Sequence, residues 1–221
     1  MEDTFKHKRW RHEMVQALIE KGISDRRVLQ AIEEVPRHLF LETMLDYMAY
    51  EDRALPISCN QTISQPSTVA FQSELLDASP EMKVLEVGTG SGYQTAVLCS
   101  MNLKVYSVER QKELYDVSKS RLEQLHYRAK CFLGDGYKGL PEFGPFDRIL
   151  ITCGAPEIPP SLVEQLKVGG IMVVPVGDDT QEMIRVTKMG NEPTQLLQQR
   201  YGNCTFVPMI GKLDYGNPLK G

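Results

Sequence analysis

The sequence predicts an α/β protein built on a single doubly wound, mostly parallel, Rossmann-like sheet, with a helical N-terminal extension and antiparallel C-terminal strands. From residue 83 to residue 182, short apolar runs alternate with helix-like periodicity, which is typical of right-handed βαβ units. Residues 9–50 show helical spacing alone, and residues 183–207 lose it. A length of 221 residues, 42% of them hydrophobic, suits one domain with its own core.

The N-terminal extension, residues 9–50, is expected to contain two helices and a third, mixed segment over 38–50. Gly22 is expected to stop the first helix, Ser24 to cap the second, and Pro36 to follow its end. Three apolar residues are expected to share the buried face of the first helix: Val15, Leu18 and Ile19.

The segment 51–65 changes character, because it is polar and is interrupted by Pro56. Pro66 then stands at an expected first helical position, ahead of a helix that turns Val69 and Leu75 inward. A polar loop that leads into a helix N-terminus is a favourable place to hold an anion.

The remaining elements follow from the alternation of apolar runs with helical periodicity. We expect the strand ending at residue 174 to stop before Pro175. The expected strands cover 84–87, 105–108, 131–133, 149–152 and 171–174, and the expected helices cover 92–99, 111–125 and 162–166.

The strongest motif is LEVGTGSGY, in which a strand runs into three alternating glycines, Gly88, Gly90 and Gly92. Glycines at such a turn permit positive φ and let the backbone approach a ligand closely. The dinucleotide fingerprint is G-x-G-x-x-G, but here its last position is Tyr93. A carboxylate at Glu86 would repel a pyrophosphate and attract a cationic ligand, such as a sulfonium with an amino-acid tail. The alternative is a structural turn without a ligand.

Two further acidic residues follow strands. Glu109 ends the second strand about twenty residues after the glycines, where an acid accepts hydrogen bonds from ribose hydroxyls in nucleotide-binding folds. Asp135, in the turn Gly134-Asp135-Gly136, is placed to accept a hydrogen bond from an adenine amine. The alternatives are a solvated strand end for Glu109 and a simple β-turn for Asp135.

Composition and spacing exclude several functional classes. A net charge of −4 provides no basic field for nucleic acid, and no apolar run approaches the ~18 residues of a membrane span. The charged N-terminus lacks a signal-peptide core, so a soluble, cytoplasmic protein is expected. Five cysteines without C-x-x-C spacing indicate reduced thiols, and four histidines without ligand spacing indicate no metal. Ser91 does not stand in the G-x-S-x-G elbow of serine hydrolases.

With these motifs in place, the sequence resembles the protein-L-isoaspartate O-methyltransferases, a family of class I S-adenosylmethionine-dependent methyltransferases. The glycine loop is shared by methyltransferases in general, whereas QTISQP at 61–66 points to this family. Ser58-Cys59-Asn60 and Cys153-Gly154 depart from its pattern. The other matching runs are VPR at 35–37, LPI at 55–57, GDG at 134–136, APEIP at 155–159, LKVGG at 166–170, VPVG at 174–177 and FVP at 206–208.

The resemblance implies transfer of a methyl group from S-adenosyl-L-methionine to the free carboxylate of L-isoaspartyl residues in damaged proteins and peptides. S-adenosyl-L-homocysteine is the product of the cofactor, and the methyl ester collapses to a succinimide, which starts repair. A carboxylate is already ionised at pH 7, so no strong base is needed. The implied protein is a monomer with three parts in one domain, 1–221: helices and active-site loop (1–66), cofactor-binding core (67–182), and C-terminal strands and tail (183–221).

The resemblance also assigns residues. Ser64 is the expected catalytic residue and orients the acceptor carboxylate through its hydroxyl, whereas composition alone would make it a helix cap before Pro66. Val207 and Pro208 would line a substrate groove or only pack a terminal strand. The expected cofactor-binding residues are Gln61, Thr62, Ile63, Glu86, Gly88, Gly90, Ser91, Glu109, Arg110, Asp135 and Gly136.

Two other functions stay open on the sequence. One is a class I methyltransferase that acts on another peptide or a small molecule, which the unusual Ser58-Cys59-Asn60 keeps possible. The other is a non-catalytic scaffold that binds the cofactor or a protein partner.

Overall fold

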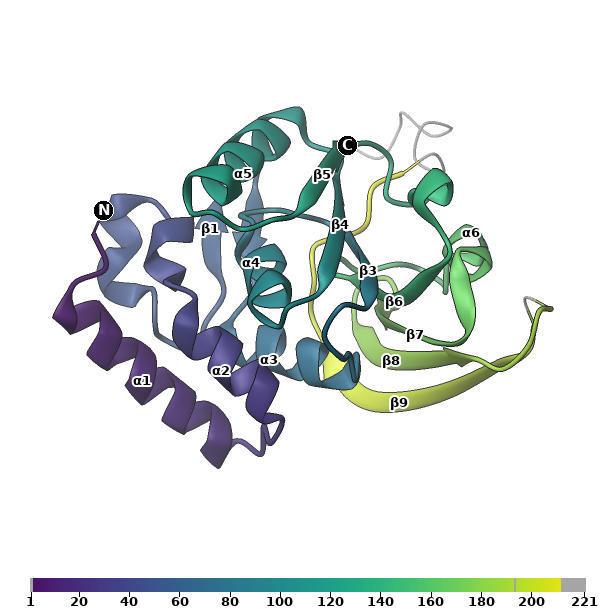
Figure 1. The fold of residues 1–221 in the computed structure, drawn as a ribbon, viewed down its shortest axis with the longest axis horizontal. Coiled ribbons are helices and arrows are strands. Elements are labelled where there is room, and N and C mark those ends of the chain that lie inside the picture. The colour runs from purple at the N-terminus through teal and green to yellow at the C-terminus, as the bar shows by residue number, and fades with distance from the viewer. Residues whose placement is uncertain (1, 193, 212–221) are drawn as a thin grey trace.

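The computed structural model describes residues 2–192 and 194–211, and its centre is a seven-stranded sheet (Figure 1). The strand order is β5-β4-β3-β6-β7-β8-β9. The strands from β5 to β7 run parallel, while β8 and β9 are antiparallel to their neighbours, so the predicted fold class is confirmed. The strands are β3 (Lys83–Val87), β4 (Lys104–Glu109), β5 (Lys130–Leu133), β6 (Phe146–Ile151), β7 (Leu166–Val176), β8 (Gln181–Lys188) and β9 (Leu196–Cys204).

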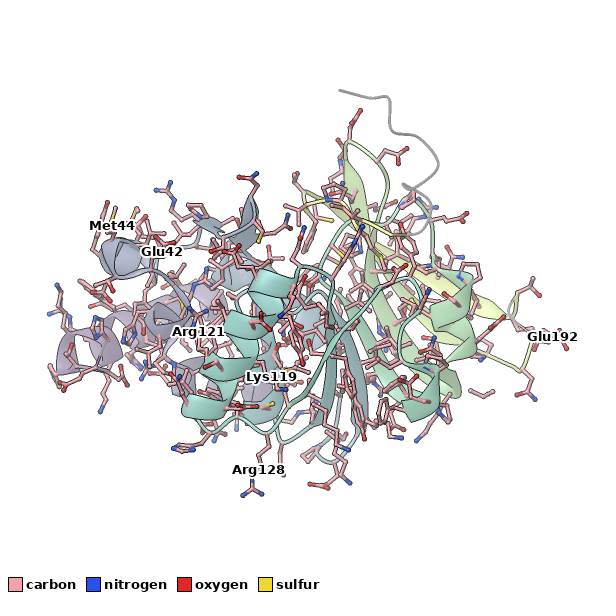
Figure 2. The ribbon with its side chains drawn as sticks, turned by 90° about the horizontal axis from the view of Figure 1, so that it is seen from above. Glu42, Met44, Lys119, Arg121, Arg128 and Glu192 are labelled. Carbon is pink, nitrogen blue, oxygen red and sulfur yellow. The ribbon has the colours of Figure 1, made fainter. Side chains whose placement is uncertain are left out.

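Helices lie on both faces of this sheet. The two N-terminal helices form an outer layer beside α3 and α4, at the end of the molecule far from β9 (Figure 1). Met44 of the N-terminal extension and Glu192 of the turn before β9 mark these opposite ends (Figure 2). The helices are α1 (Phe5–Glu20), α2 (Arg26–Glu34), α3 (Pro66–Leu75), α4 (Tyr93–Ser100), α5 (Lys112–Gln124) and α6 (Pro160–Glu164), with 3-10 turns η1 (Arg37–Phe40), η2 (Thr43–Met48) and η3 (Pro141–Phe143).

The strands supply two apolar layers, one on each face of the sheet. Val84 packs into the layer shared with α1 to α4, whereas its neighbour Leu85 packs into the layer shared with α6. In β6, Leu150 packs into the layer shared with α1 to α4, and its neighbour Ile149 packs into the layer shared with α6. This alternation follows from the two-residue period of a strand, and burial on both faces explains why the runs read as continuously apolar.

The N-terminal helices differ from the predictions in two details. Ile19 was expected to be buried with Val15 and Leu18, but it is 45% exposed because it lies at the rim of the helix face. Asp25, and not Ser24, is the N-cap of α2, and its side chain accepts a hydrogen bond from the backbone of Arg27. Ser24 instead donates through its backbone and its hydroxyl to the carboxylate of Glu74 on α3.

Strand β7 is longer at both ends than predicted. It begins at Leu166, which we expected in the preceding helix, and it continues through Pro175 to Val176. Pro175 pairs with Met183 of β8, and its carbonyl accepts a hydrogen bond from the backbone of Ala155. A proline is tolerated here because only one donor is lost, one residue from the end of the strand.

The segment expected to be a loop contains a small hairpin. Strand β1 (Leu55–Ile57) pairs antiparallel with β2 (Gln61–Ile63), and α3 begins three residues after β2. The hairpin therefore delivers the QTIS sequence directly to the start of a helix.

Two remaining predictions concern the C-terminal tail and membrane-spanning helices. The expected tail after residue 211 lies outside the described residues. Within residues 2–192 and 194–211, no helix combines the length and the apolar character that a bilayer crossing requires.

Candidate active site

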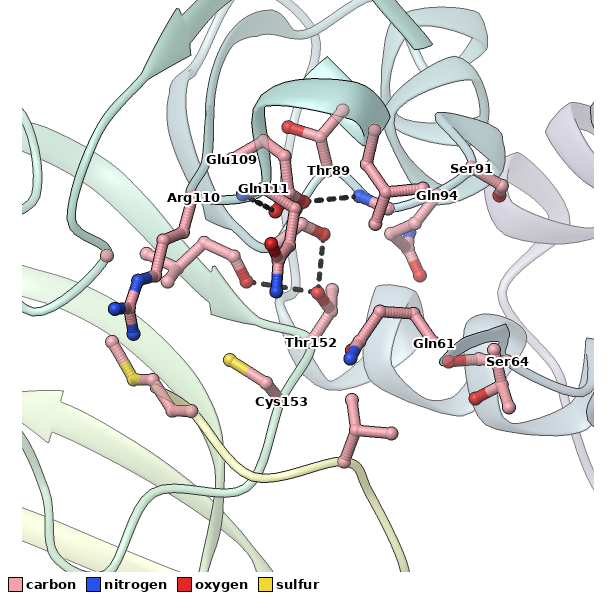
Figure 3. A pocket seen from close by; sticks show the side chains of 18 of the residues that line it. Gln61, Ser64, Thr89, Ser91, Gln94, Glu109, Arg110, Gln111, Thr152 and Cys153 are labelled. Atoms are coloured by element: carbon pink, nitrogen blue, oxygen red, sulfur yellow. Dashed lines mark hydrogen bonds between the residues drawn. The ribbon is translucent and has the colours of Figure 1, made fainter. Parts of the chain in front are cut away.

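A cavity opens at the carboxyl ends of the central strands, with about 870 Å³ of space between its atoms, part of it open to solvent (Figure 3). Strand β3 has β4 on one side and β6 on the other, so the chain reverses its order of strands at this point. Ligands of open α/β sheets bind at such a switch point. The cavity brings together the glycine loop, the end of β4, the end of β6, the hairpin and the segment 207–210.

The glycine loop forms one wall, and its backbone needs glycine. Gly88, Gly90 and Gly92 have φ values of +99°, +52° and +88°. A Cβ atom on Gly88 would lie 2.5 Å from the Thr152 hydroxyl, which itself donates to the Gly88 carbonyl at 2.6 Å. The end of β6 therefore braces the loop, and no side chain fits at Gly88.

Glu109 faces the cavity and joins two elements around it. Its Oε2 accepts a hydrogen bond from the Gly90 backbone at 2.9 Å, and its Oε1 accepts one from Gln111 at 2.8 Å (Figure 3). The side chain is 7% exposed. Each carboxylate oxygen keeps another lone pair, so the group suits a pair of ribose hydroxyls, and that contact stays a prediction.

Glu86 lies elsewhere than we expected. The side chain is fully buried and does not line the cavity, because the strand turns it toward α4. Its Oε2 accepts hydrogen bonds from Thr95 at 2.5 Å and Ser107 at 2.6 Å. Thr89 of the glycine loop lies 2.6 Å from the Ser107 hydroxyl. Burial raises the pKa of Glu86 to about 7, and its carboxyl meets the loop only through these hydroxyls.

The turn after β5 contributes its glycine and not its acid to the cavity. Gly136 lines the cavity, and a Cβ atom there would lie 2.5 Å from Val87. Asp135 is outside the lining, and its Oδ1 accepts a hydrogen bond from the Tyr137 backbone at 3.0 Å. This hydrogen bond shows the turn that the alternative interpretation described, and the contact between Asp135 and a ligand stays a prediction.

The hairpin forms the opposite wall. Gln61, Thr62, Ile63 and Ser64 all line the cavity. Ser64 is not the cap of α3, since the N-cap is Gln65 and the Ser67 backbone donates to Asp52 at 2.8 Å. The helix-capping alternative for Ser64 is therefore wrong.

The hairpin turn contains one departure from the family pattern. Cys59 and Asn60 have φ values of +59° and +54°, where glycine is usual. Asn tolerates this region, whereas Cys does so at a cost in free energy.

Two other predicted cofactor residues, Ser91 and Arg110, also line the cavity. The Ser91 hydroxyl accepts a hydrogen bond from the Tyr93 backbone at 3.2 Å, so this side chain supports the start of α4.

Val207 and Pro208 line the cavity and also pack beside Gly154, whose backbone donates to the Val207 carbonyl at 2.8 Å, while their contact with a substrate stays a prediction. Several other cavity residues were not predicted. Thr89 and Gln94 had a usable signal, since they flank the glycines. The others are Val69, Val87, Tyr93, Val108, Gln111, Leu114, Thr152, Cys153, Met209 and Ile210.

The cavity fits an adenosyl group with a charged tail. Gly88 and Gly136 line it without side chains, Glu109 offers acceptors, and Val87 and Met209 provide apolar surface. Among the described residues that line the cavity, Glu109 is acidic and Arg110 is basic, so the cavity offers a ligand one charged group of each sign.

Comparison with known proteins agrees with this geometry. The family model described as protein-L-isoaspartate(D-aspartate) O-methyltransferase matches residues 8–214. A protein-L-isoaspartate O-methyltransferase of Cytophaga hutchinsonii is 53% identical over 96% of each chain, and that of Christiangramia forsetii is 52% identical over 95% of this chain and 98% of the relative.

Solved structures extend the comparison to the fold. A structure titled protein-L-isoaspartate O-methyltransferase superposes with a TM-score of 0.84 at 31% identity, covering 92% of this chain and 67% of the other. A putative protein-L-isoaspartate O-methyltransferase from Plasmodium falciparum, in complex with S-adenosyl-L-homocysteine, gives 0.79 at 26% identity and covers 90% and 98%. The chain therefore belongs to the protein-L-isoaspartate(D-aspartate) O-methyltransferase family.

Proposed function

We infer that the chain transfers a methyl group from S-adenosyl-L-methionine to the free carboxylate of L-isoaspartyl residues in damaged proteins and peptides, and so starts their repair. One observation carries this conclusion: a single cavity has the glycine loop and Glu109 on one wall and Ser64 on the other. Such an arrangement lets a methyl donor and an acceptor meet, and the family membership names both.

On the donor wall, the residues present suit the cofactor. We propose that Glu109 accepts the ribose hydroxyls and that Gly88, Gly90 and Gly136 give the close backbone approach. Arg110 lies next to Glu109 on this wall, and we propose that Gln61, Thr62 and Ile63 of the hairpin contact the cofactor from the opposite wall. The bound cofactor would supply an electrophilic methyl group on a positively charged sulfur.

On the acceptor wall, we propose that the Ser64 hydroxyl donates a hydrogen bond to the acceptor carboxylate and fixes its direction. The carboxylate is ionised at pH 7, so the protein needs to supply no base. Opposite charges about 4 Å apart attract by roughly 4 kcal/mol at an effective dielectric near 20, but this attraction fades as the charges cancel in the reaction. Alignment of the two groups must therefore supply much of the rate.

The test is a methyl-transfer assay with labelled S-adenosyl-L-methionine and two peptides that differ only in an isoaspartyl or a normal aspartyl linkage. Labelling of the isoaspartyl peptide alone is expected. Binding of S-adenosyl-L-homocysteine without labelling would favour the non-catalytic scaffold, and labelling of other acceptors alone would favour a different methyltransferase.

Ser64→Ala is expected to lower turnover about 10- to 100-fold, because a hydrogen bond to a charged group is lost. The dissociation constant of S-adenosyl-L-homocysteine, measured by calorimetry, should stay near the parent value. Ser67→Ala, on the first turn of α3 and outside the cavity lining, is the matched control. Equal turnover in Ser64→Ala and the parent would remove Ser64 from the mechanism.

We further propose that the enzyme works as a monomer in the cytoplasm, on protein and peptide substrates and not on nucleic acid. The net charge of −4 provides no basic field for nucleic acid, and all five cysteines are free thiols, as suits a reducing compartment.

A further inference from the structure

Gln94, the second residue of α4, has a side-chain oxygen with nothing to accept. The residue is 8% exposed, and its Nε2 donates to the Ser73 hydroxyl on α3 at 2.9 Å. Its Oε1 is buried and has no hydrogen-bond partner within the described part of the chain. Figure 3 shows this oxygen pointing into the cavity. A buried acceptor left unpaired costs free energy, so a ligand with a donor group is the natural partner.

The position of Gln94 favours the acceptor substrate over the cofactor. Its amide is anchored to α3, the helix that begins directly after Ser64 and Gln65, and Val69 of that helix also lines the cavity. Glu109, Arg110 and Gln111 lie on the other side of the cavity in Figure 3. Gln94 follows the glycine loop in the chain, but its side chain is tied to α3, the helix that continues from the Ser64 wall, where the proposed function places the carboxylate.

The chemistry of an isoaspartyl residue supplies the missing donor. In this linkage the free carboxylate and the peptide nitrogen are attached to the same carbon atom. In a normal aspartyl residue, the side-chain carboxylate is one methylene farther from that nitrogen. Two protein groups at a fixed separation, one for the carboxylate and one for the N–H, can therefore distinguish the two linkages.

We propose that Gln94 is a specificity-determining residue, whose Oε1 accepts the peptide N–H of the isoaspartyl residue while Ser64 holds its carboxylate. This inference rests on the proposed function. With a normal aspartyl residue, only one of the two hydrogen bonds forms in the reactive alignment, and the other group stays buried and unpaired. Sites built around such hydrogen bonds reject analogues that lack them far more strongly than apolar pockets do.

The experiment pairs a protein change with a substrate change. Gln94→Met removes the acceptor at similar length, and a depsipeptide substrate carries an ester oxygen in place of the isoaspartyl N–H. Gln72→Met is the matched control, because Gln72 is also buried with an unpartnered Oε1 but lies outside the cavity lining and bonds to the Ile151 carbonyl. Both variants are compared by kcat/KM and by calorimetry with S-adenosyl-L-homocysteine.

Gln94→Met is expected to lower kcat/KM for the isoaspartyl peptide about 10- to 100-fold, with cofactor-product affinity unchanged. The ester should cost the parent and Gln72→Met a similar factor, and should cost Gln94→Met nothing further. An equal ester penalty in Gln94→Met and the parent would overturn the inference. So would a parallel loss of S-adenosyl-L-homocysteine affinity, which would assign Gln94 to the cofactor.

Failure of the proposed function gives a different result. In that case the parent binds S-adenosyl-L-homocysteine but does not methylate the isoaspartyl peptide at all, and the role of Gln94 falls with it.

Discussion

The two walls of the cavity are built in opposite ways. The glycine-loop wall belongs to the central sheet, and it is held by Thr152, directly after β6, and by Glu109 at the end of β4. The Ser64 wall comes from a two-stranded hairpin whose strands pair only with each other, at three residues each. Its turn contains two non-glycine residues at positive φ. The cofactor side is therefore held by the central sheet, whereas the acceptor side depends on a few local contacts.

The largest effect is expected from a substitution in the glycine-loop wall. Gly88→Ala places a Cβ atom 2.5 Å from the Thr152 hydroxyl at a φ of +99°, so the loop must move. We expect S-adenosyl-L-homocysteine affinity to fall by more than about 100-fold, since β6 and the loop cannot keep their contacts. Isothermal titration calorimetry measures this directly.

Gly22→Ala is the control for Gly88→Ala, because Gly22 has a φ of +96° but open space around its Cβ position. It should cost only about 1–2 kcal/mol of unfolding free energy and leave binding unchanged. Similar binding in both variants would show that the loop wall is not rigid.

A second test concerns Glu86, the buried acid behind the glycine-loop wall. The pKa of Glu86 is raised from 4.5 to about 7, so the folded protein retains this proton to higher pH than the unfolded chain. This group therefore lowers the free energy of unfolding as pH rises from about 4.5 to about 7, by at most about 3 kcal/mol. Glu86→Gln should remove that part of the pH dependence, measured by denaturant unfolding at pH 5 and pH 8.

The exposed Glu81, paired with Lys104, offers the matched control Glu81→Gln, which should keep the parent slope. An unchanged slope in Glu86→Gln would mean that the buried acid does not titrate in this range.

A third test loosens the acceptor wall. Asp52 accepts a hydrogen bond from the Ser67 backbone at the start of α3 and pairs with Lys21 at the end of α1. Asp52→Ala should cost about 1–2 kcal/mol, as loss of a helix cap does. Because Ser64 lies three residues before Ser67, we also expect lower turnover with little change in cofactor-product affinity.

Turnover can be restored by Asp52→Asn if the cap matters, since an amide oxygen still accepts the Ser67 N–H. A loss of cofactor-product affinity equal to the loss of turnover would contradict the separation of the two walls.

The smallest expected effect strengthens the hairpin. Cys59→Gly should raise the free energy of unfolding by about 0.5–1 kcal/mol, because glycine adopts the observed φ of +59° without strain. Cys59→Ala removes the thiol but keeps the strain, so it should bring no gain. Thermal unfolding of both variants decides whether strain or the thiol matters.

Much of the fold was predictable because its signals are local. The alternation of apolar runs and helices located the strands of the sheet, and the glycines together with Glu109 located the cofactor wall. The hairpin was missed because its turn, at Cys59 and Asn60, lacks the glycine that usually marks a two-residue turn.

The sequence could not identify the cavity residues that only the folded chain brings together. Thr152, Cys153 and Met209 reach the cavity because the sheet places β6 beside β3 and because the chain after β9 returns to Gly154. Glu86 was misplaced for a related reason. The motif fixes its position in the strand, but only the packing of α4 shows which way its side chain turns.

That return of the chain to Gly154 has a consequence for biosynthesis. The backbone of Met209 donates to the Gly154 carbonyl, so one of the last described stretches to leave the ribosome closes one side of the pocket. A nascent chain that has paired its sheet through β8 still lacks this side. Competence for methyl transfer then requires that residues 207–210 have been synthesised and have docked beside Gly154.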